Sequence, residues 1–312
     1  MTREQITYLV FGIALVLALI FDLGLLSKKS SIVSTKKALF QTIFWVALAL
    51  GFGVFIAIEI NSAVALEYMS AYLMEWSLSI DNIFVFILIF TFFGVKETHY
   101  GRVLLIGILT AIVLRILFIT VGIELVERFR WILYIFGVIL VITGVKMFTA
   151  DKDEEIDLEK NRVYRLIKRV LPLTNEEHGT RLTVRKDGKR LYTKIFVVII
   201  MLATIDVLFA LDSIPAVFAI SQNRLVVYTS NVFAVLGLRS LFFLLKGAVD
   251  KFSHLQQGIA IVLIFIGCKM LAEVPFINFH IPVYISLIVI VVCLAGAIIY
   301  SIQVAEKGDE EA

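Results

Sequence analysis

Charge, cysteine and histidine are all scarce in this chain, and each shortage argues against a class of protein. Only 18% of the 312 residues are charged, and there are only 2 cysteines and 4 histidines. Cys268 and Cys293 each stand alone in an apolar run without a neighbouring Cys or His, so there is no CxxC pair and no zinc knuckle. We interpret both cysteines as small apolar residues of a packed interior.

The motifs of common enzymes are also missing. The sequence contains no phosphate-binding glycine loop, no Ser-His-Asp arrangement and no zinc-protease motif. It has no basic stripe with interleaved aromatic residues, the pattern that indicates a nucleic-acid partner. We therefore expect neither an enzyme nor a nucleic-acid-binding protein.

Apolar residues are abundant instead. They make up 60% of the chain at a mean hydropathy of +0.95, whereas soluble domains are about 45–50% apolar. Because a spanning helix needs roughly 20 mostly apolar residues, the runs predict an all-α polytopic membrane protein of about nine transmembrane helices. The predicted spans are 6–26, 38–58, 69–93, 103–123, 131–149, 194–220, 226–247, 256–272 and 282–302.

Lysine and arginine are distributed unevenly between the connections of these spans. They crowd into the first connection and every second one after it, above all into 150–193. The opposite connections hold Arg3, Arg128, Arg130 and Arg224. Because basic loops remain cytoplasmic, we expect the N-terminus outside and the C-terminus inside.

The segment 150–193 is the longest polar stretch. Apolar residues from Val163 to Val170 recur at helical spacing with Lys and Arg opposite. This pattern predicts a helix that lies on the anionic inner membrane surface or packs on the protein's own loops. Asp187 and Gly188 separate two short alternating runs, which predicts a β-hairpin.

Two of the apolar runs contain pairs of acids at the same spacing. Glu75 and Asp81 lie six residues apart in "MEWSLSIDNIFVFILIF", and Asp206 and Asp212 lie six apart in "LATIDVLFALDSIPAVFAI". An ionisable group at bilayer depth costs about 2.5–3.5 kcal/mol on insertion scales. Four such groups need compensation.

Two mid-span arginines, Arg115 and Arg239, follow the acid runs, one after each. We predict that they balance the charge of the acids or gate access to them. Against four carboxylates they leave a formal excess of two negative charges. One divalent cation or two protons would neutralise that excess.

The same order of features occurs twice: an acid-containing span, an arginine-containing span and a span ending in Gly-x-Lys-Met, at Lys146 and Lys269. Because each unit has an odd number of spans, the second unit enters the membrane from the opposite side. We therefore predict two inverted three-helix repeats, which in many transporters enclose a binding site at the membrane midplane. The two lysines then lie near opposite surfaces and can extend to them. A symmetric scaffold without transport is the alternative.

The predicted division of the chain is 1–66 (two helices), 67–149 (first repeat), 150–193 (cytoplasmic loop), 194–272 (second repeat) and 273–312 (last helix and tail).

The acids of one pair do not converge on a straight helix, because residues six apart point about 120° apart and lie about 9 Å apart along the axis. Either each acid points at a different neighbour or the helix breaks, for which Pro215 offers a cause in the second run. Oxygen-bearing side chains flank the acids, above all Asn82 and Ser213, with Asn231 and Asp22 as additional candidates. A ligand set of oxygens without His or Cys favours Mg²⁺, Ca²⁺ or Mn²⁺.

Several stretches resemble one known family. "EWSLSIDNIFV", "ALDSIPAVFA", "SNVFAVLGLRSLFFLL" and "WILYIFGVILVITGVKM" are similar to sequences of the TerC family of integral membrane proteins, and most of all to its Alx-type members. The resemblance covers nearly the whole chain. It implies a bacterial inner-membrane protein from a family that is named for tellurium resistance and whose bacterial members are implicated in Mn²⁺ export. The ion-handling residues that it implies are Glu75, Asp81, Asp206 and Asp212, with Asn82 and Ser213 beside them.

We therefore expect a transporter that exports Mn²⁺, or a related hard divalent cation, without a permanently bound cofactor. Its partners are the ion and membrane lipid, and the sequence leaves a homo-oligomer open. Proton antiport is a hypothesis, since carboxylates that release a metal can take up protons. Two alternatives remain: a non-transporting scaffold that acts through 150–193, and a redox or tellurite-resistance modulator that acts through partner proteins. The modulator would need a cofactor or a reactive thiol.

Overall fold

The computed structural model describes residues 2–26, 33–149, 169, 171–174, 179–186, 189–246, 255–272 and 281–311. Within these ranges some side chains are not described, among them those of Asp22, Asp81 and Asp212. The described elements are α1 (Arg3–Leu26), α2 (Thr35–Glu59), α3 (Ser62–Phe92), α4 (Glu97–Arg128), α5 (Ile132–Thr149), β1 (Thr183–Lys186), β2 (Lys189–Tyr192), α7 (Lys194–Ile220), α8 (Arg224–Leu236), α9 (Leu238–Leu245), α10 (Leu255–Ala272) and α11 (Val283–Glu311).

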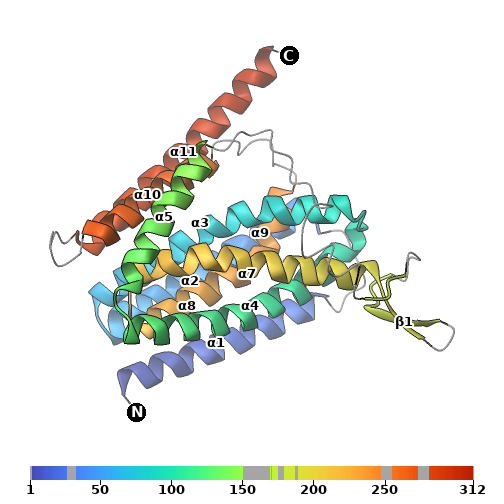
Figure 1. The fold of residues 1–312 in the computed structure, drawn as a ribbon, viewed down its shortest axis with the longest axis horizontal. Coiled ribbons are helices and arrows are strands. Elements are labelled where there is room, and N and C mark those ends of the chain that lie inside the picture. The colour runs from blue at the N-terminus through green and yellow to red at the C-terminus, as the bar shows by residue number, and fades with distance from the viewer. Residues whose placement is uncertain are drawn as a thin grey trace.

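Most of the helices run side by side as one bundle. In Figure 1, α1 to α4 and α7 to α9 lie roughly parallel or antiparallel to one another, whereas α5, α10 and α11 form a second group that crosses them obliquely. The β-hairpin lies at one end of the bundle and the N-terminus at the other. The long helices therefore traverse the bundle in alternating directions, the arrangement of a chain that crosses a membrane repeatedly.

Helix length and composition support a multi-pass membrane protein. Seven segments in the described part of the chain are long and apolar enough to cross a membrane: Arg3–Ile20, Thr35–Glu59, Ser62–Phe92, Glu97–Arg128, Ile132–Thr149, Arg224–Leu245 and Tyr284–Ser301. The apolar stretch Gln256–Ala272 of α10 is shorter, and α7, with 27 residues, occupies the sixth predicted run. A total of nine spans stays a prediction.

The breaks in the helices lie elsewhere than the sequence indicated. The helix α7 continues through Pro215 to Ile220, so the alternative of a break between its two acids is wrong. Ile214 and Ala216 on either side of the proline are buried, and the packing around them holds the helix together despite one lost backbone hydrogen bond. The predicted span 226–247 is instead interrupted at Gly237, which separates α8 from α9.

The predicted β-hairpin is confirmed. Its strands β1 and β2 are antiparallel, with Thr183 opposite Tyr192. The next residue, Thr193, caps α7: its hydroxyl accepts a hydrogen bond from the backbone N–H of Phe196 and donates to the carbonyl of Arg181 at 2.6 Å. The hairpin is thereby joined to the start of α7. Except for residue 169, the amphipathic helix predicted near 163–170 lies outside the described residues.

The helices α5 and α10 cross at very close range. A Cβ atom on Gly137 would lie 3.2 Å from the carbonyl oxygen of Gly267, and one on Gly267 would lie 2.8 Å from the carbonyl oxygen of Gly137. Further along the crossing, a Cβ atom on Gly144 would lie 2.8 Å from the carbonyl oxygen of Ala260. Small residues permit this approach of two backbones, as they do in many membrane helix pairs.

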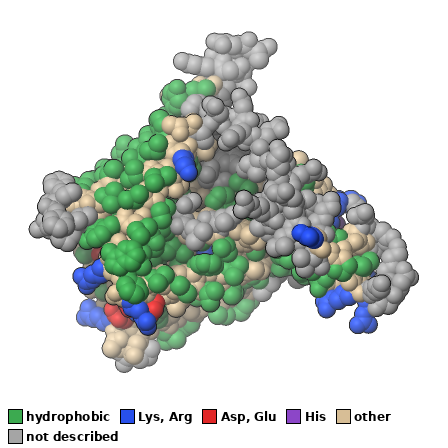
Figure 2. Space-filling model, in the orientation of Figure 1, with side chains coloured by type: hydrophobic (Ala, Val, Ile, Leu, Met, Phe, Trp, Pro, Cys, Tyr) green, Lys and Arg blue, Asp and Glu red, His purple; other side chains and the backbone are tan. Residues whose placement is uncertain are grey.

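The apolar side chains divide into a buried centre and an exposed outer surface. The helices α8 and α9 are buried along most of their length, whereas α1, α2, α4, α5 and α11 expose large apolar side chains such as Leu17, Val113 and Val292. Figure 2 shows hydrophobic side chains over much of the visible helical surface. A soluble monomer rarely exposes so large an apolar surface, so lipid is its natural environment.

One lysine behaves differently from the prediction. Lys146 of α5 is exposed, but Lys269 of α10 is only 4% exposed, and its ammonium donates to Ser286 Oγ of α11 at 3.2 Å. The prediction that Lys269 extends to a membrane surface is therefore wrong. The reason is that α11 packs over α10 and offers a hydroxyl acceptor.

Candidate functional site

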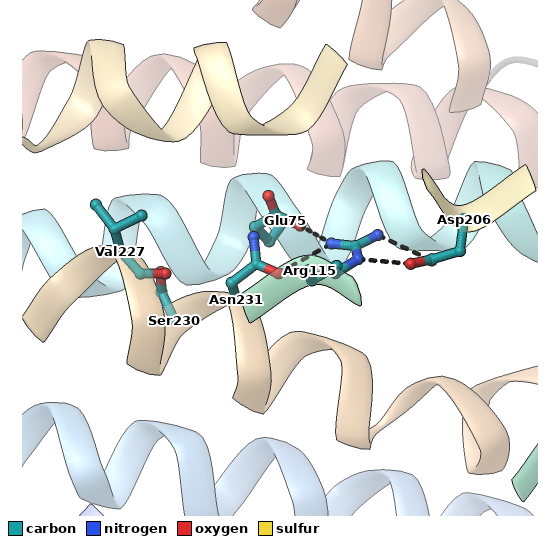
Figure 3. A network of polar contacts seen from close by, with 6 residues as sticks. All are labelled: Glu75, Arg115, Asp206, Val227, Ser230 and Asn231. Carbon is teal, nitrogen blue, oxygen red and sulfur yellow. Dashed lines mark hydrogen bonds and ion pairs between the residues drawn. The ribbon is translucent and has the colours of Figure 1, made fainter. Parts of the chain in front are cut away.

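Arg115 of α4 binds two acids that come from different helices. Its Nη1 donates to Glu75 Oε2 of α3 at 2.7 Å, and its Nε and Nη2 donate to Asp206 Oδ2 and Oδ1 of α7 at 2.8 and 3.0 Å. Nη1 also donates to Asn231 Oδ1 of α8 at 3.1 Å. Figure 3 shows the guanidinium between the two carboxylates, with Asn231 beside Glu75. We call these four residues the Arg115 network.

The Arg115 network is withdrawn from solvent. The exposed fractions are 0% for Glu75, 2% for Arg115, 1% for Asp206 and 1% for Asn231. Charges interact strongly in such surroundings, and the two parallel bonds to Asp206 fix the geometry of that pair. Two carboxylates and one guanidinium leave a formal charge of −1. Since uncompensated buried charge is costly, the network favours the approach of a further cation.

Several polar atoms on the same helices have no hydrogen-bond partner among the described residues. They are Glu75 Oε1, Ser79 Oγ, Asn82 Nδ2, Ser213 Oγ and Asn231 Nδ2. All of these side chains are buried. Buried polar atoms are rarely left unsatisfied, and where they are, an ordered water or an ion is a common reason.

The structure brings together part of the set predicted from the sequence. Glu75, Asp206, Arg115 and Asn231 meet in the Arg115 network. Asn82 and Ser213 are buried and follow Glu75 and Asp206 by seven residues, which places them about 20° from those acids on the same helix faces.

For the remaining predicted residues the structure gives only the helix on which each one lies. Arg239 is buried in α9, 7% exposed. The side chains of Asp22, Asp81 and Asp212 lie outside the described residues. Among the side chains that are described, no group of three or more His, Cys, Asp or Glu could hold a metal ion. The four-acid site therefore stays a prediction, of which the structure places Glu75 and Asp206.

A small cavity adjoins Asp206. Its volume is about 10 Å³, roughly the room that one water molecule needs. Apart from Asp206 its lining is apolar: Phe86, Leu104, Gly107, Ile108, Ala111, Leu202 and Leu238. Buried waters usually have two to four polar partners, and this lining offers one polar side chain. The cavity is therefore suited to exclude water from Asp206.

The apolar residues that line this cavity could not be predicted from the sequence. They are apolar residues in apolar runs, so nothing in their pattern distinguishes them from lipid-facing neighbours. The sequence placed Arg115 in the middle of a span but did not show which acids it binds, because Glu75 lies 40 positions away and Asp206 lies 91 positions away.

A family model described as "Integral membrane protein TerC family" matches residues 60–309. The chain belongs to the TerC family. The match confirms the resemblance found in the sequence, and it includes every residue of the Arg115 network. No solved structure matches this TerC protein.

Relatives of this TerC protein are similar over nearly their whole length. It is 41% identical to an uncharacterized membrane protein of Myxococcus xanthus, over 93% of this chain and 90% of the relative. It is 39% identical to a Salmonella typhi protein named "Putative membrane-bound redox modulator Alx", over 96% and 95% of the two chains. A membrane protein of Rickettsia felis is 37% identical, over 95% and 97%.

Proposed function

We propose that this TerC protein is a membrane transporter that exports Mn²⁺, or another hard divalent cation, from the cytoplasm. The observation that carries the proposal is the Arg115 network, in which α3 and α7 each present a buried carboxylate to one guanidinium (Figure 3). Buried intramembrane acids mark ion pathways in many membrane proteins. Carboxylate, amide and hydroxyl oxygens favour Mn²⁺, Mg²⁺ or Ca²⁺ over softer metals, and the family resemblance favours Mn²⁺ among these.

Arg115 acts as a tethered cation in this proposal. An arriving divalent ion competes with the guanidinium for the oxygens of Glu75 and Asp206. Asn231 Oδ1 already accepts a bond from Nη1 and gives the displaced guanidinium a neutral partner. Asp81 and Asp212 are the remaining acids of the predicted site, and protons on these carboxylates are the candidates for exchange against the metal.

The crossing of α5 and α10 supports the proposed inverted repeats. Aligning the two Gly-x-Lys-Met segments places Gly144 on Gly267 and Gly137 on Ala260. The close contact between Gly137 and Gly267 then maps onto the close contact between Ala260 and Gly144. Reciprocal contacts of this kind are what a two-fold relation produces. The repeats, with two preceding spans and one following span, account for nine spans.

The cavity beside Asp206 supports a closed access path on the side of the hairpin. Leu104 and Leu202 lie in the first three turns of α4 and α7, at the end of the bundle where the hairpin lies (Figure 1). A space of about 10 Å³ has room for about one water molecule, and so none for an ion with its hydration shell. We propose that these apolar side chains, with Phe86, close the cytoplasmic access and separate when the transporter opens inward.

Cellular manganese content tests the proposed function. Cells loaded with Mn²⁺ are compared with and without the chain, and with the variants Glu75→Gln and Asp206→Asn. We expect the wild type to lower cellular manganese and both variants to fail. Glu124→Gln is the matched control, because Glu124 is an exposed acid near the end of α4. If Asp206→Asn exported manganese as well as the wild type, at equal abundance in the membrane, the proposal would be refuted.

A second candidate function is that of a membrane-bound redox modulator, which the name of the Salmonella typhi relative favours. Such a protein needs a cofactor or a reactive thiol. Cys268 is exposed on α10, so the interpretation as a residue of a packed interior is wrong for it, and Cys293 is half-buried in α11; both are free thiols. The double variant Cys268→Ala/Cys293→Ala separates the two proposals. Transport predicts full manganese export from this variant, whereas a thiol-based modulator predicts loss of function.

A further inference from the structure

Most buried hydroxyls in these helices are satisfied by their own backbone. The hydroxyls of Thr42, Ser70, Ser77 and Thr229 each donate to the carbonyl four residues earlier, at 2.5 to 2.9 Å. This local bond is the ordinary solution for Ser and Thr inside a helix that has no water around it. We therefore expect the other buried hydroxyls of the bundle to make the same bond.

Ser79 of α3 and Ser213 of α7 depart from that expectation. Ser79 is 0% exposed and Ser213 is 1% exposed, yet neither hydroxyl has a hydrogen-bond partner among the described residues. A buried polar group without a partner destabilises the folded protein, because it has lost its bonds to water. Two such hydroxyls, on the two helices that carry the acids, therefore need a reason to remain free.

Helix geometry places both hydroxyls on the faces that carry the acids. Ser79 follows Glu75 by four residues and so lies about 40° from it around α3. Ser213 follows Asp206 by seven residues and lies about 20° from it around α7. Since Glu75 and Asp206 both reach Arg115, these two faces look toward the same guanidinium.

We infer that Ser79 is a further ligand of the transported cation, together with Ser213 on the opposite helix. The inference rests on the proposed function and adds a residue to its site. Glu75 Oε1, which also lacks a partner in the described chain, lies one turn from Ser79 and supplies the neighbouring charged oxygen. A hydroxyl replaces a hydration water of a hard cation without adding negative charge. The ion is thus coordinated without being held too strongly to leave.

Mn²⁺ titration of the purified full-length protein by calorimetry tests the inference. Ser79→Ala and Ser213→Ala are compared with Ser77→Ala, in which the lost hydroxyl had donated to the backbone carbonyl of Leu73. We expect each of the first two variants to lower Mn²⁺ affinity about tenfold or more, because each loses one oxygen ligand of the ion. Ser77→Ala should bind like the wild type, and thermal unfolding checks that all variants are folded.

The outcomes distinguish the inference from the proposed function. If the wild type binds Mn²⁺ and Ser79→Ala binds it equally well, the role of Ser79 is refuted while transport stands. If the folded wild type binds no Mn²⁺ up to millimolar concentration, the proposed function and the inference are both refuted.

A gain-of-function variant gives a second, independent measurement. Ser79→Cys is introduced into the Cys268→Ala/Cys293→Ala background and titrated with Cd²⁺. A thiolate selects soft metals, so a cysteine that faces the ion should raise Cd²⁺ affinity well above that of the background protein. Ser77→Cys points about 160° away from Glu75 and should give no such gain. Equal Cd²⁺ affinity for the two variants would place Ser79 away from the ion and overturn the inference.

Discussion

Replacing Arg115 by methionine removes the only described cation that contacts two buried carboxylates. The guanidinium makes four hydrogen bonds, to Glu75, Asp206 and Asn231, and all of these groups are at most 2% exposed. Removing one partner of a buried ion pair typically costs about 3–5 kcal/mol, because the other charge stays behind. Here two charges stay behind, so we expect a loss in the upper part of that range.

Reversible unfolding in detergent, followed by circular dichroism, measures this loss. The triple variant Glu75→Gln/Arg115→Met/Asp206→Asn is the key comparison. Replacing all the charged groups of a buried network by uncharged ones often changes the stability of a protein very little. We expect the triple variant to regain more than half of the stability that Arg115→Met loses. Such a regain would show that the three residues contribute to stability together, because the effects of the single variants would not add up to that of the triple variant.

Added Mn²⁺ distinguishes an ion site from a purely structural salt bridge. A ligand at 100 times its dissociation constant stabilises a protein by about 2.7 kcal/mol. Because the ion no longer competes with a guanidinium, Mn²⁺ should stabilise Arg115→Met more than it stabilises the wild type. A loss of less than about 1 kcal/mol for Arg115→Met, against the 3–5 expected for a buried pair, or no stabilisation of either protein by Mn²⁺, would refute this role of Arg115.

Three further predictions concern packing, surface charge and access. Gly144→Val should lower the unfolding temperature strongly, because a Cβ atom there would lie 2.8 Å from a backbone carbonyl oxygen of α10; overpacking typically costs about 1–3 kcal/mol. Arg224→Ala should leave that temperature almost unchanged, because its ion pair with Glu127 is more than half exposed. Gly107→Ala should slow Mn²⁺ flux without weakening equilibrium Mn²⁺ binding, because the added methyl group would lie in the cavity, 3.4 Å from Leu202.

The helices could be predicted from the sequence because burial in lipid demands long apolar runs. Each predicted run is occupied by helix in the structure. The family could also be predicted, from stretches such as that around Glu75. The interruption at Gly237 could not, because a single glycine weakens a helix by about 1 kcal/mol relative to alanine, and tertiary packing decides whether that matters. Pro215 shows the converse, since its helix persists.

The candidate site could be predicted only in part. Charge in an apolar run singled out Glu75, Asp206 and Arg115, because such residues are costly in a membrane. The sequence could not show that one arginine binds both acids, because that depends on how α3, α4 and α7 pack. Helix spacing puts Ser79 nearer than Ser77 to the face of Glu75, but only the structure shows that Ser77 bonds to its own helix and that Ser79 does not.

Mn²⁺ flux into liposomes that contain only the purified protein shows whether the chain itself carries the ion and whether Asp206 is needed for it. A fluorescent dye inside the vesicles reports Mn²⁺ entry for the wild type and for Asp206→Asn. We expect saturable entry with the wild type and none with the variant, although both proteins fold. Folded wild-type protein that carries no Mn²⁺, or an Asp206→Asn variant that carries it at the same rate, would refute the proposed transport.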